Sequence, residues 1–507
     1  MRTSLLPYAL LFILILEPGF SVSTDDFSGV LYSGMDRGIH AKGTAPPREE
    51  WMLILNHEKN PVGYCHSVFQ KKCLNGFNFI QVINESFIRT KGKYRSYEEY
   101  AIRRTALLKE NGGGFIAFRV ERPSSRAKIL EGVIREKTLF LKITQSSQVY
   151  HKEIPLKGNL YLLDLLNLPK SEIRSGNKVE VQIFNEELLS LDTLQILFLE
   201  SPPIPEEKGG AGKKVMKAEL ILRKQKNIVY LNAEGEMISG KDLVKNIEVV
   251  SSDKNNIFQS KLQKYVIPDF FFADKLRIRS PDKLKSLVLK ISPKSPEEYL
   301  PIVEDERQKV LSRDPVSKQI ILHIKRQAED LSHEVSGYGV PTNENRPILE
   351  TESAKTFQFL NTVVNKIKKE KPLKLGELLV KWVFLYISDK EYRQYMSVEE
   401  IIRSRQGDCK AHAMLYTVLA RLSGLPVRYC VGLVYDSKYR EFTGHIWVKI
   451  YTGRTWVAMD PAFNQTRIDP THIQFMEGSE ERVLLFDFFN TLYHLRDSHF
   501  EILETTS

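Results

Sequence analysis

The chain has 507 residues, of which 42% are hydrophobic and 27% are charged. This length allows two or three domains, because single hydrophobic cores rarely grow beyond a few hundred residues. The net charge of +10 is compatible with an anionic partner. No zinc-finger, RNA-binding or helix-turn-helix motif accompanies it, so we expect no nucleic-acid partner and favour a solvated basic surface.

The first residues have the features of a secretion signal. Arg2 is followed by an apolar run from Leu5 to Leu16, and Ser21-Val22-Ser23 is a small-x-small cleavage site. This pattern predicts a signal peptide over residues 1–23 and a secreted or periplasmic protein. The alternative is an uncleaved anchor. No other stretch is long and apolar enough to span a membrane, so we expect a soluble protein or peripheral contact with the cell envelope.

Alternating apolar and polar residues indicate β-structure over most of the N-terminal half. We expect a β-rich N-terminal domain over residues 24–200. Proline and glycine then dominate S-P-P-I-P-E-E-K-G-G-A-G-K-K, which is typical of a linker over residues 201–214. A second β-rich segment is predicted over residues 215–300.

Cys65 and Cys73 flank a short polar stretch between two extended apolar runs. If the chain turns between them, an oxidising compartment can join them across a hairpin, and the sequence leaves this open. Cys430 lies in the extended run R-Y-C-V-G-L-V-Y and is interpreted as a thiol of the core.

The apolar spacing changes after residue 300. Asp314-Pro315 is typical of a helix N-cap followed by a first-turn proline, and Ile320, Ile321 and Ile324 fit one helical face. We therefore expect a helical connector over residues 301–354 and an α+β domain over residues 355–507.

The segment R-S-R-Q-G-D-C-K-A-H-A places Cys409 just before a helix with Leu415 and Val418 on its apolar face. Ser397-Val398-Glu399-Glu400 is a capping box that opens a short helix before it. Free backbone N–H groups and the helix dipole stabilise negative charge at a helix N-terminus, which favours a thiolate. A lone cysteine at such a position is nevertheless most often a packing residue.

Two predicted strands downstream supply the groups that a thiolate nucleophile needs. G-H-I-W-V-K-I-Y contains His445, the turn T-G-R follows, and T-W-V-A-M-D-P ends on Asp460. Adjacent antiparallel strands can bring a carboxylate beside an imidazole. Asp460 would then fix the ring tautomer while His445 exchanges a proton with Cys409. Each residue alone has an ordinary structural explanation, and the combination carries the prediction.

These segments, G-D-C-K-A-H-A-M-L-Y, G-H-I-W-V-K-I and W-V-A-M-D-P-A-F, resemble the core of the transglutaminase-like superfamily and its exported bacterial members in particular. The resemblance extends to I-D-P-T-H-I at 468–473 and, more faintly, to W-M-L-I-L-N-H-E-K-N-P-V-G-Y-C-H near the N-terminus. It implies an α+β, papain-like cysteine domain with a core helix packed on an antiparallel sheet, and a catalytic triad of Cys409, His445 and Asp460.

Residues near the predicted triad also have expected roles. His412 and Trp447 are predicted to line or brace the substrate pocket, and core packing is the alternative for Trp447. The same structural interpretation covers His472 and Asp408. A zinc site built from Cys409, His412 and His445 fits no common structural-zinc spacing, so we expect no metal and no cofactor.

The sequence thus predicts an exported cysteine enzyme acting on amide bonds of a peptide or a glutamine carboxamide. A thioester intermediate would be resolved by hydrolysis, deamidation or amine transfer. The expected partner is a protein or peptide substrate, including a component of the cell envelope. The alternative is a non-catalytic envelope binding or structural protein that uses the same fold.

Overall fold

A computed structural model describes residues 5–7 and 47–507 except for short internal stretches. These are 75–76, 92–97, 111–113, 123–127, 146–147, 164, 187, 201–214, 224, 234, 244–246, 267–270, 273–275, 294–299, 328–353, 391–396, 480–486, 489–490, 492–494 and 496–497. The chain divides into two compact units, Met1–Ile267 and Pro268–Ser507. Apart from strand β1 (Leu5–Pro7), the predicted signal peptide lies outside the described residues. In the described part of the chain, no helix has the length and apolar character needed to cross a membrane.

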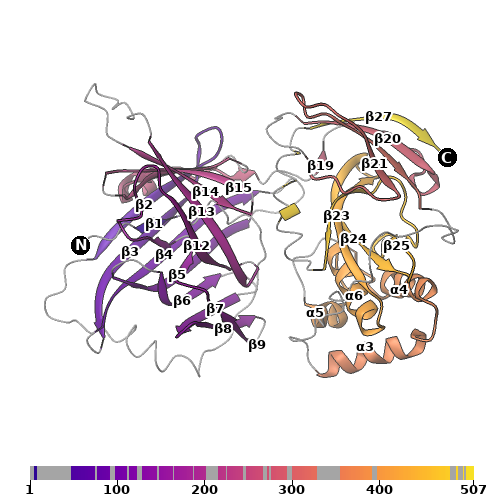
Figure 1. Cartoon of the computed structure of the whole chain (residues 1–507), viewed down its shortest axis with the longest axis horizontal. Helices are drawn as coiled ribbons and strands as arrows, with labels where there is room; N and C mark the ends of the chain where they lie inside the picture. The colour runs from indigo at the N-terminus through magenta and orange to yellow at the C-terminus, as the bar shows by residue number, and fades with distance from the viewer. Residues whose placement is uncertain are drawn as a thin grey trace. The chain divides into compact units, whose positions relative to one another are not determined.

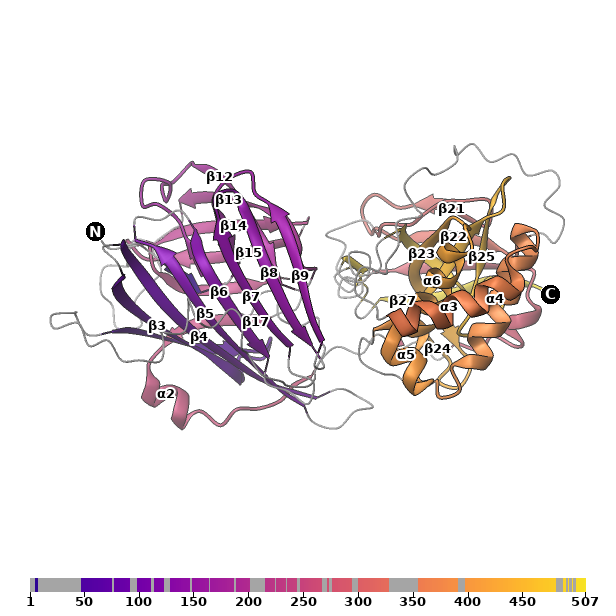
Figure 2. The same cartoon turned by 90° about the horizontal axis from the view of Figure 1, so that it is seen from below.

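The N-terminal unit is one large, strongly curved and mainly antiparallel sheet (Figures 1 and 2). Its core draws on strands from both ends of the sheet. Besides β1, its elements are β2 (Arg48–Leu55), β3 (Pro61–Leu74), β4 (Phe77–Lys91), β5 (Glu98–Lys109), β6 (Phe115–Arg122), β7 (Lys128–Arg135), β8 (Thr138–Gln145), β9 (Gln148–Pro155), β10 (Leu160–Leu162), β11 (Leu165–Asn167), β12 (Lys178–Asn185), β13 (Ser190–Glu200), β14 (Met216–Leu222), β15 (Gln225–Leu231), β16 (Met237–Asp242), β17 (Ile247–Ser252), α2 (Lys254–Gln259) and β18 (Tyr265–Val266).

The domain boundary expected at residues 201–214 does not separate two sheets. Those residues are outside the described part, but the strands on either side, β13 and β14, pair antiparallel from Leu194 with Leu222 to Glu200 with Met216. The predicted linker therefore joins neighbouring strands of one sheet. Its proline and glycine content fits a hairpin connection as well as a domain linker, and composition alone does not distinguish them.

The structure excludes the hairpin between Cys65 and Cys73 that the sequence left open. Both residues lie in the single strand β3, where Cys65 pairs with Ser86 and Cys73 with Asn78 of β4. A strand rises about 3.3 Å per residue, so eight residues separate their Cα atoms by roughly 26 Å. A disulfide needs Cα atoms within about 7 Å, and these two cysteines cannot form one in this fold.

In the described part of the C-terminal unit there are four α-helices, one 3-10 helix and two sheets (Figure 1). One sheet has the order β19-β24-β23-β26 with β25 on β24, and the other has the order β21-β22-β20-β27. The elements are β19 (Phe271–Phe272), the 3-10 helix η1 (Pro281–Lys283), β20 (Ser286–Ser292), β21 (Gln308–Arg313), β22 (Ile320–Lys325), α3 (Ala354–Ile367), α4 (Pro372–Tyr386), α5 (Val398–Ser404), α6 (Cys409–Leu422), β23 (Val427–Asp436), β24 (Glu441–Tyr451), β25 (Trp456–Met459), β26 (Ile473–Gly478) and β27 (His499–Thr506).

The helix expected after Asp314 is also wrong, because Ile320–Lys325 forms strand β22. Asp314 does cap backbone N–H groups, accepting from Val316 at 2.9 Å and Ser317 at 2.6 Å, but it does so in the turn between β21 and β22. Burial along β22 alternates, with Ile320, Leu322 and Ile324 fully buried. The predicted connector over 301–354 therefore contains a β-hairpin, and its residues 328–353 lie outside the described part.

Helix α6 is the centre of this unit. It contacts β23 and β24 on the sheet side and α3, α4 and α5 on the other sides. Every residue from Ala411 to Ala420 is buried, so the helix is enclosed all round, which is typical of a core helix rather than a surface helix. Its two ends are partly exposed, at Cys409 and Lys410 and again at Arg421 and Leu422.

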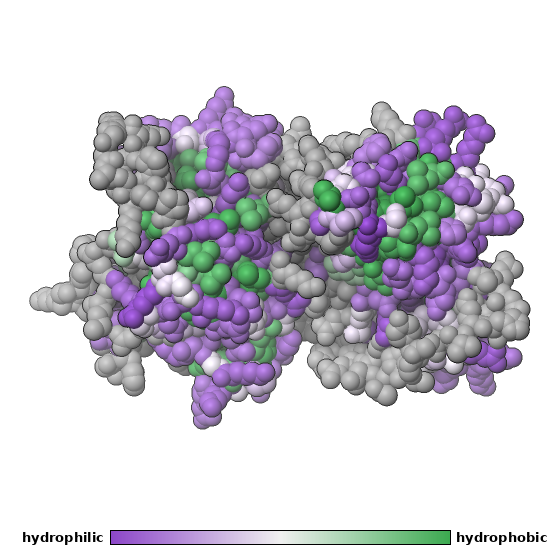
Figure 3. Space-filling model, turned by 45° about the horizontal axis from the view of Figure 1, so that its top comes forward, coloured by the Kyte–Doolittle hydropathy of each residue, from purple (hydrophilic) through white to green (hydrophobic). Residues whose placement is uncertain are grey.

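The outer surface of the C-terminal unit is not uniformly polar. The face seen in Figure 3 carries an apolar area on this unit. Exposed apolar side chains of the sheet β21-β22-β20-β27 include Leu311, 57% exposed, and Leu503, 44% exposed. This sheet therefore buries one face against the core and leaves apolar groups on the other.

Candidate active site

Cys409 is the first residue of α6, and the local sequence explains its position. Asp408 is the N-cap, and its carboxylate accepts a hydrogen bond from the backbone N–H of Lys410 at 3.0 Å. Upstream, Ser397 and Glu400 form the capping box of α5, which ends at Ser404 before Arg405 in the left-handed region. The thiol consequently sits among the free N–H groups of the first turn, which stabilise negative charge.

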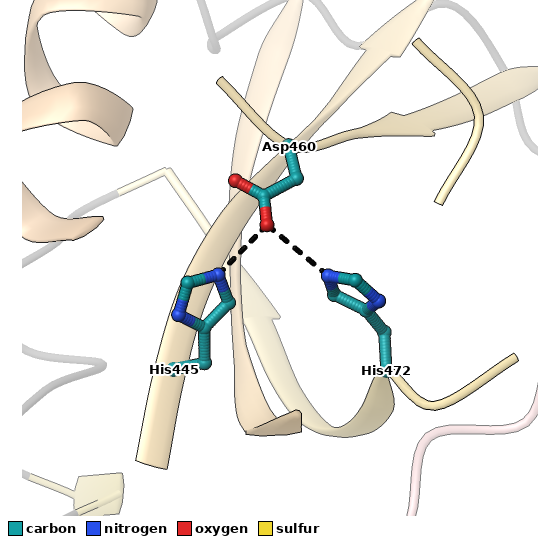
Figure 4. A group of neighbouring side chains, drawn as sticks. All are labelled: His445, Asp460 and His472. Carbon is teal, nitrogen blue, oxygen red and sulfur yellow. Dashed lines mark hydrogen bonds and ion pairs between the residues drawn. The ribbon is translucent and has the colours of Figure 1, made fainter. Parts of the chain in front are cut away.

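His445 reaches the same place from the sheet. It lies on β24 opposite Gly432 of β23, and Asp460 follows directly after β25, which pairs with β24. The Nε2 atom of His445 is 2.8 Å from Oδ2 of Asp460. Both side chains are buried, with Asp460 fully inaccessible. The two strands thus place a carboxylate against the imidazole, as Figure 4 shows.

Cys409 completes this group. Burial acts to lower the pKa of His445, but the Asp460 carboxylate and the Cys409 side chain both raise it, and a hydrogen bond to the Cys409 side chain contributes; the net shift is upward. Because Nε2 is bonded to Asp460, Nδ1 is the ring nitrogen that can serve the thiol. A raised pKa means that His445 holds a proton readily, which suits a partner of a thiolate.

Both oxygens of the Asp460 carboxylate are held by hydrogen bonds. Its Oδ1 accepts from the backbone N–H groups of Ala462 at 2.7 Å and Phe463 at 3.2 Å. Burial acts to raise the pKa of Asp460, but His445 and His472 outweigh it and hold the pKa well below its usual range. The carboxylate is therefore ionised at neutral pH and can orient the His445 ring.

The sequence assigns His472 only a lining or bracing role and misses its contact with Asp460. His472, just before β26, places Nε2 3.1 Å from the same Oδ2 atom (Figure 4). Phe463 is a further residue missed by sequence reasoning. Its ring, 44% exposed, stacks on His445 with the centroids 4.8 Å apart. The segment D-P-A-F and the motif D-P-T-H-I were the available signals.

The two residues predicted to shape a substrate pocket are both buried. His412, 1% exposed, places Nδ1 2.7 Å from the Asp408 carbonyl oxygen, and Lys390 Nζ lies 3.3 Å from Nε2. Burial lowers the pKa of His412 to about 4. Trp447 is fully buried beside His445 and His472, with ring centroids 6.2 Å and 5.3 Å away. These contacts brace the site, and direct contact with substrate stays a prediction for both residues.

Cys430 lies apart from this chemistry. It is fully buried, packs with Trp447, Ala458 and Ile468, and forms no disulfide with Cys409. Burial raises the pKa of the Cys430 thiol strongly, so it is an inert core thiol, in contrast to the partly exposed thiol at the helix end.

Among the described residues, one group of side chains has the donor atoms for a metal ion. Ligand atoms of His445, Asp460 and His472 lie within 4.8 Å of one another. This group differs from the Cys409, His412 and His445 set considered from the sequence. Its atoms are already joined by hydrogen bonds, and the second nitrogen of His472 faces Asp469 at 3.3 Å, so the arrangement is explained without an ion.

One family model matches part of the C-terminal unit. The family model of the transglutaminase-like superfamily matches residues 361–461, a range that includes Cys409, His445 and Asp460. The chain therefore contains a transglutaminase-like domain, preceded by the large β-rich region. The match ends before Asp469 and His472. A search of curated proteins gave no match.

Two solved structures are similar to parts of the chain. One is described as a "Putative Cysteine Protease from Cytophaga hutchinsonii", with 13% identity and a TM-score of 0.24, covering 44% of this chain and 85% of that one. The other is a β-barrel-like protein with a domain of unknown function from Brucella abortus, with 8% identity and a TM-score of 0.29, covering 41% of this chain and 98% of that one. Likenesses this distant bear on no functional question.

Proposed function

We propose that the transglutaminase-like domain is a cysteine-dependent enzyme that acts on amide bonds of peptides or glutamine carboxamides, and that the protein is exported to the periplasm or secreted. The observation that carries the proposal is the contact series from the helix end to the sheet. Cys409 interacts with His445, and His445 lies 2.8 Å from Asp460.

In the proposed reaction, Cys409, His445 and Asp460 act both when the thioester forms and when it is resolved. The Cys409 thiolate attacks the carbonyl carbon, and its own backbone N–H is a natural donor to the developing oxyanion. His445 gives its proton to the departing nitrogen, so that ammonia or an amine leaves and a thioester remains. An incoming water or amine then passes a proton to His445 and displaces the thiolate. Asp460 holds the ring in orientation throughout.

Labelling of Cys409 tests whether the thiol is activated. Full-length protein is treated with iodoacetamide near neutral pH, and the modified peptide is followed by mass spectrometry, with Cys409→Ala as the background. Labelling faster than that of a free thiol, lost in His445→Ala, supports the enzyme. Labelling no faster than a free thiol favours a non-catalytic binding protein built on this fold.

The reaction itself is tested separately. Glutamine-containing peptides are incubated with the protein, with and without a primary amine donor, and the products are weighed by mass spectrometry. Hydrolysis, deamidation and amine transfer each give a different mass change. A product that forms with the natural chain and is absent with Cys409→Ala is the expected result, and no product with an active thiol would exclude these amide substrates.

A further inference from the structure

His472 is a second imidazole that contacts the Asp460 carboxylate, in addition to His445. Its side chain is fully buried, and it contacts a carboxylate at each ring nitrogen: Nε2 is 3.1 Å from Asp460 Oδ2, and Nδ1 is 3.3 Å from Asp469 Oδ1. In Figure 4 the two imidazoles flank the carboxylate of Asp460 from opposite sides. Asp460 Oδ2 is thus shared between His445 and His472.

This geometry determines the protonation of His472. A neutral imidazole has one N–H group, so it would turn a nitrogen lone pair toward one of the two carboxylates. The imidazolium donates to both. Burial acts to lower the pKa of His472, but Asp469 and Asp460 raise it beyond that effect. The charge of His472 is therefore balanced inside the protein.

Asp469 is itself held in place. Its Oδ1 accepts from the backbone N–H of Thr471 at 2.8 Å and from the Thr471 hydroxyl at 2.5 Å, and its Oδ2 accepts from Gln465 Nε2 at 2.7 Å. Gln465 in turn pairs with Asp460 through two backbone hydrogen bonds of 2.8 Å and 2.9 Å. The Asp469 carboxylate is therefore linked to Asp460 through Gln465.

The backbone of His472 is anchored from another element. Arg307, which precedes β21 and is 4% exposed, donates from Nη2 to the His472 carbonyl oxygen at 2.7 Å. Since both the ring and the carbonyl are held, His472 cannot turn away without breaking several buried hydrogen bonds. Fixed geometry of this kind is what a supporting residue of a catalytic group needs.

We propose that His472, as an imidazolium held between Asp469 and Asp460, is a positioning residue for His445, and this inference rests on the proposed function. His472 holds the Asp460 carboxylate in place, and its positive charge offsets part of the negative charge of that carboxylate. Because the rings of His445 and His472 are 5.8 Å apart, the positive charge of His472 also opposes the one on His445. The protonated His445 is then stabilised enough to form and is still able to release its proton to a leaving group.

Among the described residues, Asp460 after β25 and Cys409 on α6 act on His445 directly. His472 and Asp469 before β26 act on Asp460 or on each other, while His412 on α6 and Arg307 before β21 interact with Asp460 and Asp469 respectively. Removing the charge of His472 is expected to shift the titration of His445 upward.

The test uses the full chain and iodoacetate, an anionic reagent that is attracted by a protonated His445. Its rate of reaction with Cys409 rises as the thiolate forms and falls as His445 loses its proton, which gives a bell-shaped profile. His472→Gln retains an N–H toward Asp460 without the charge, and His472→Ala removes both. His323→Gln, on β22 outside the site, is the control.

Two results are expected. In His472→Gln the alkaline limb of the profile moves up by about one pH unit, because a neighbouring positive charge has been removed. In His472→Ala the maximal rate falls by about 10- to 100-fold, as is typical when a residue that orients a functional group is lost, and the glutamine restores most of it. The profile of His323→Gln should match that of the natural chain.

The outcomes separate this inference from the proposed function. If Cys409 of the natural chain reacts like a free thiol, the proposed function fails and the inference fails with it. If Cys409 is activated but His472→Gln leaves both limbs in place, only the inference is overturned. Should the variants not fold, ¹⁵N NMR of the natural chain decides: two protonated ring nitrogens on His472 at neutral pH support the inference, and a single one overturns it.

Discussion

The two units of the molecule bury charge in different ways. In the N-terminal unit, Arg104 is 3% exposed and meets Glu186 through two hydrogen bonds of 2.9 Å and 3.1 Å. In the C-terminal unit, the fully buried Asp460 meets two imidazoles at 2.8 Å and 3.1 Å. Both arrangements pair a buried charged group with an opposite charge or a hydrogen-bond partner, so burial alone does not separate a structural site from a chemical one.

The difference lies in the partners. A guanidinium keeps its proton at every physiological pH, so the Arg104–Glu186 pair has one charge state and can only stabilise the sheet. Imidazoles gain and lose protons near neutral pH, so the Asp460 site can pass a proton to and from Cys409. A buried carboxylate therefore suggests chemistry when its partners can titrate and a nucleophile is near.

The largest effects are expected when the carboxylate is neutralised in each of these two arrangements, which tests the difference between them directly. Asp460→Asn leaves buried imidazoles without their central charge, and we expect a loss of about 3–5 kcal/mol in the free energy of unfolding of the C-terminal unit. We also expect at least about a 100-fold fall in Cys409 labelling, because the ring of His445 loses its orientation. Urea denaturation and iodoacetamide labelling measure the two effects.

Glu186→Gln is the matched control in the other unit. It removes the negative charge opposite the buried Arg104 guanidinium and should destabilise the N-terminal unit by a similar amount. Labelling of Cys409 should stay at the rate of the natural chain. Equal loss of labelling in both variants would mean that Asp460 acts through stability alone.

Much of the site could be predicted from the sequence because its signals are local. The helix start at Cys409, the capping box at Ser397 and the strand-turn-strand that carries His445 and Asp460 all depend on neighbouring residues. The contact of the second histidine with Asp460 could not be predicted in this way, although its sequence position suggested a lining or bracing role. His472 meets Asp460 across twelve residues of irregular chain, and no periodicity reports where such a segment folds back.

The errors in the fold have the same origin. The spacing of Ile320, Ile321 and Ile324 fits a helical face, but β-branched residues also suit a strand. Pairing with β20 and β21 makes this segment the strand β22. Similarly, the sequence left a hairpin between Cys65 and Cys73 open because the polar stretch between them is compatible with a turn. The strand continues through that stretch because β4 pairs with it throughout. Long-range pairing, which single segments do not encode, decided each case.

Gly432 offers a test of the close packing behind the site. A Cβ atom at this position would overlap the carbonyl oxygen of Ile473 on β26 and crowd the ring of Trp447. Gly432→Ala should cost about 1–3 kcal/mol of stability, because the backbone of β26 must move. Since Ile473 is next to His472, the variant should also slow Cys409 labelling. Urea denaturation and the iodoacetate profile measure these two effects. Gly453→Ala would be a poor control, because the φ of 92° at Gly453 is strained for alanine.

A pH-dependent effect is expected from His412. Its pKa in the folded state is lowered to about 4, mainly by burial, against about 6.5 in an unfolded chain. The unfolded state then binds more protons between these values, so stability is fully present above pH 6.5 and falls as the pH drops toward 4. The loss is about 2 kcal/mol at pH 5.

His412→Gln should remove this part of the acid sensitivity while the rest of the profile remains. Urea denaturation at pH 7 and pH 5 measures the difference between the two proteins. An equal loss of stability in both proteins between these pH values would show that His412 is not held neutral, contrary to its contact with Lys390.

The smallest expected effect concerns the cap of α5. The Ser397 hydroxyl accepts from the backbone N–H of Glu400 at 3.2 Å, and Glu400 Oε2 accepts from the backbone N–H of Ser397 at 2.9 Å. Ser397→Ala should cost about 1 kcal/mol, the usual value of an N-cap, and Ser397→Asp should recover most of it. Because α5 contacts α6 without bearing a group of the site, Cys409 labelling in folded Ser397→Ala should be unchanged. A fall in labelling that exceeds the loss of folded protein would instead mean that the start of α5 helps to set the position of the thiol.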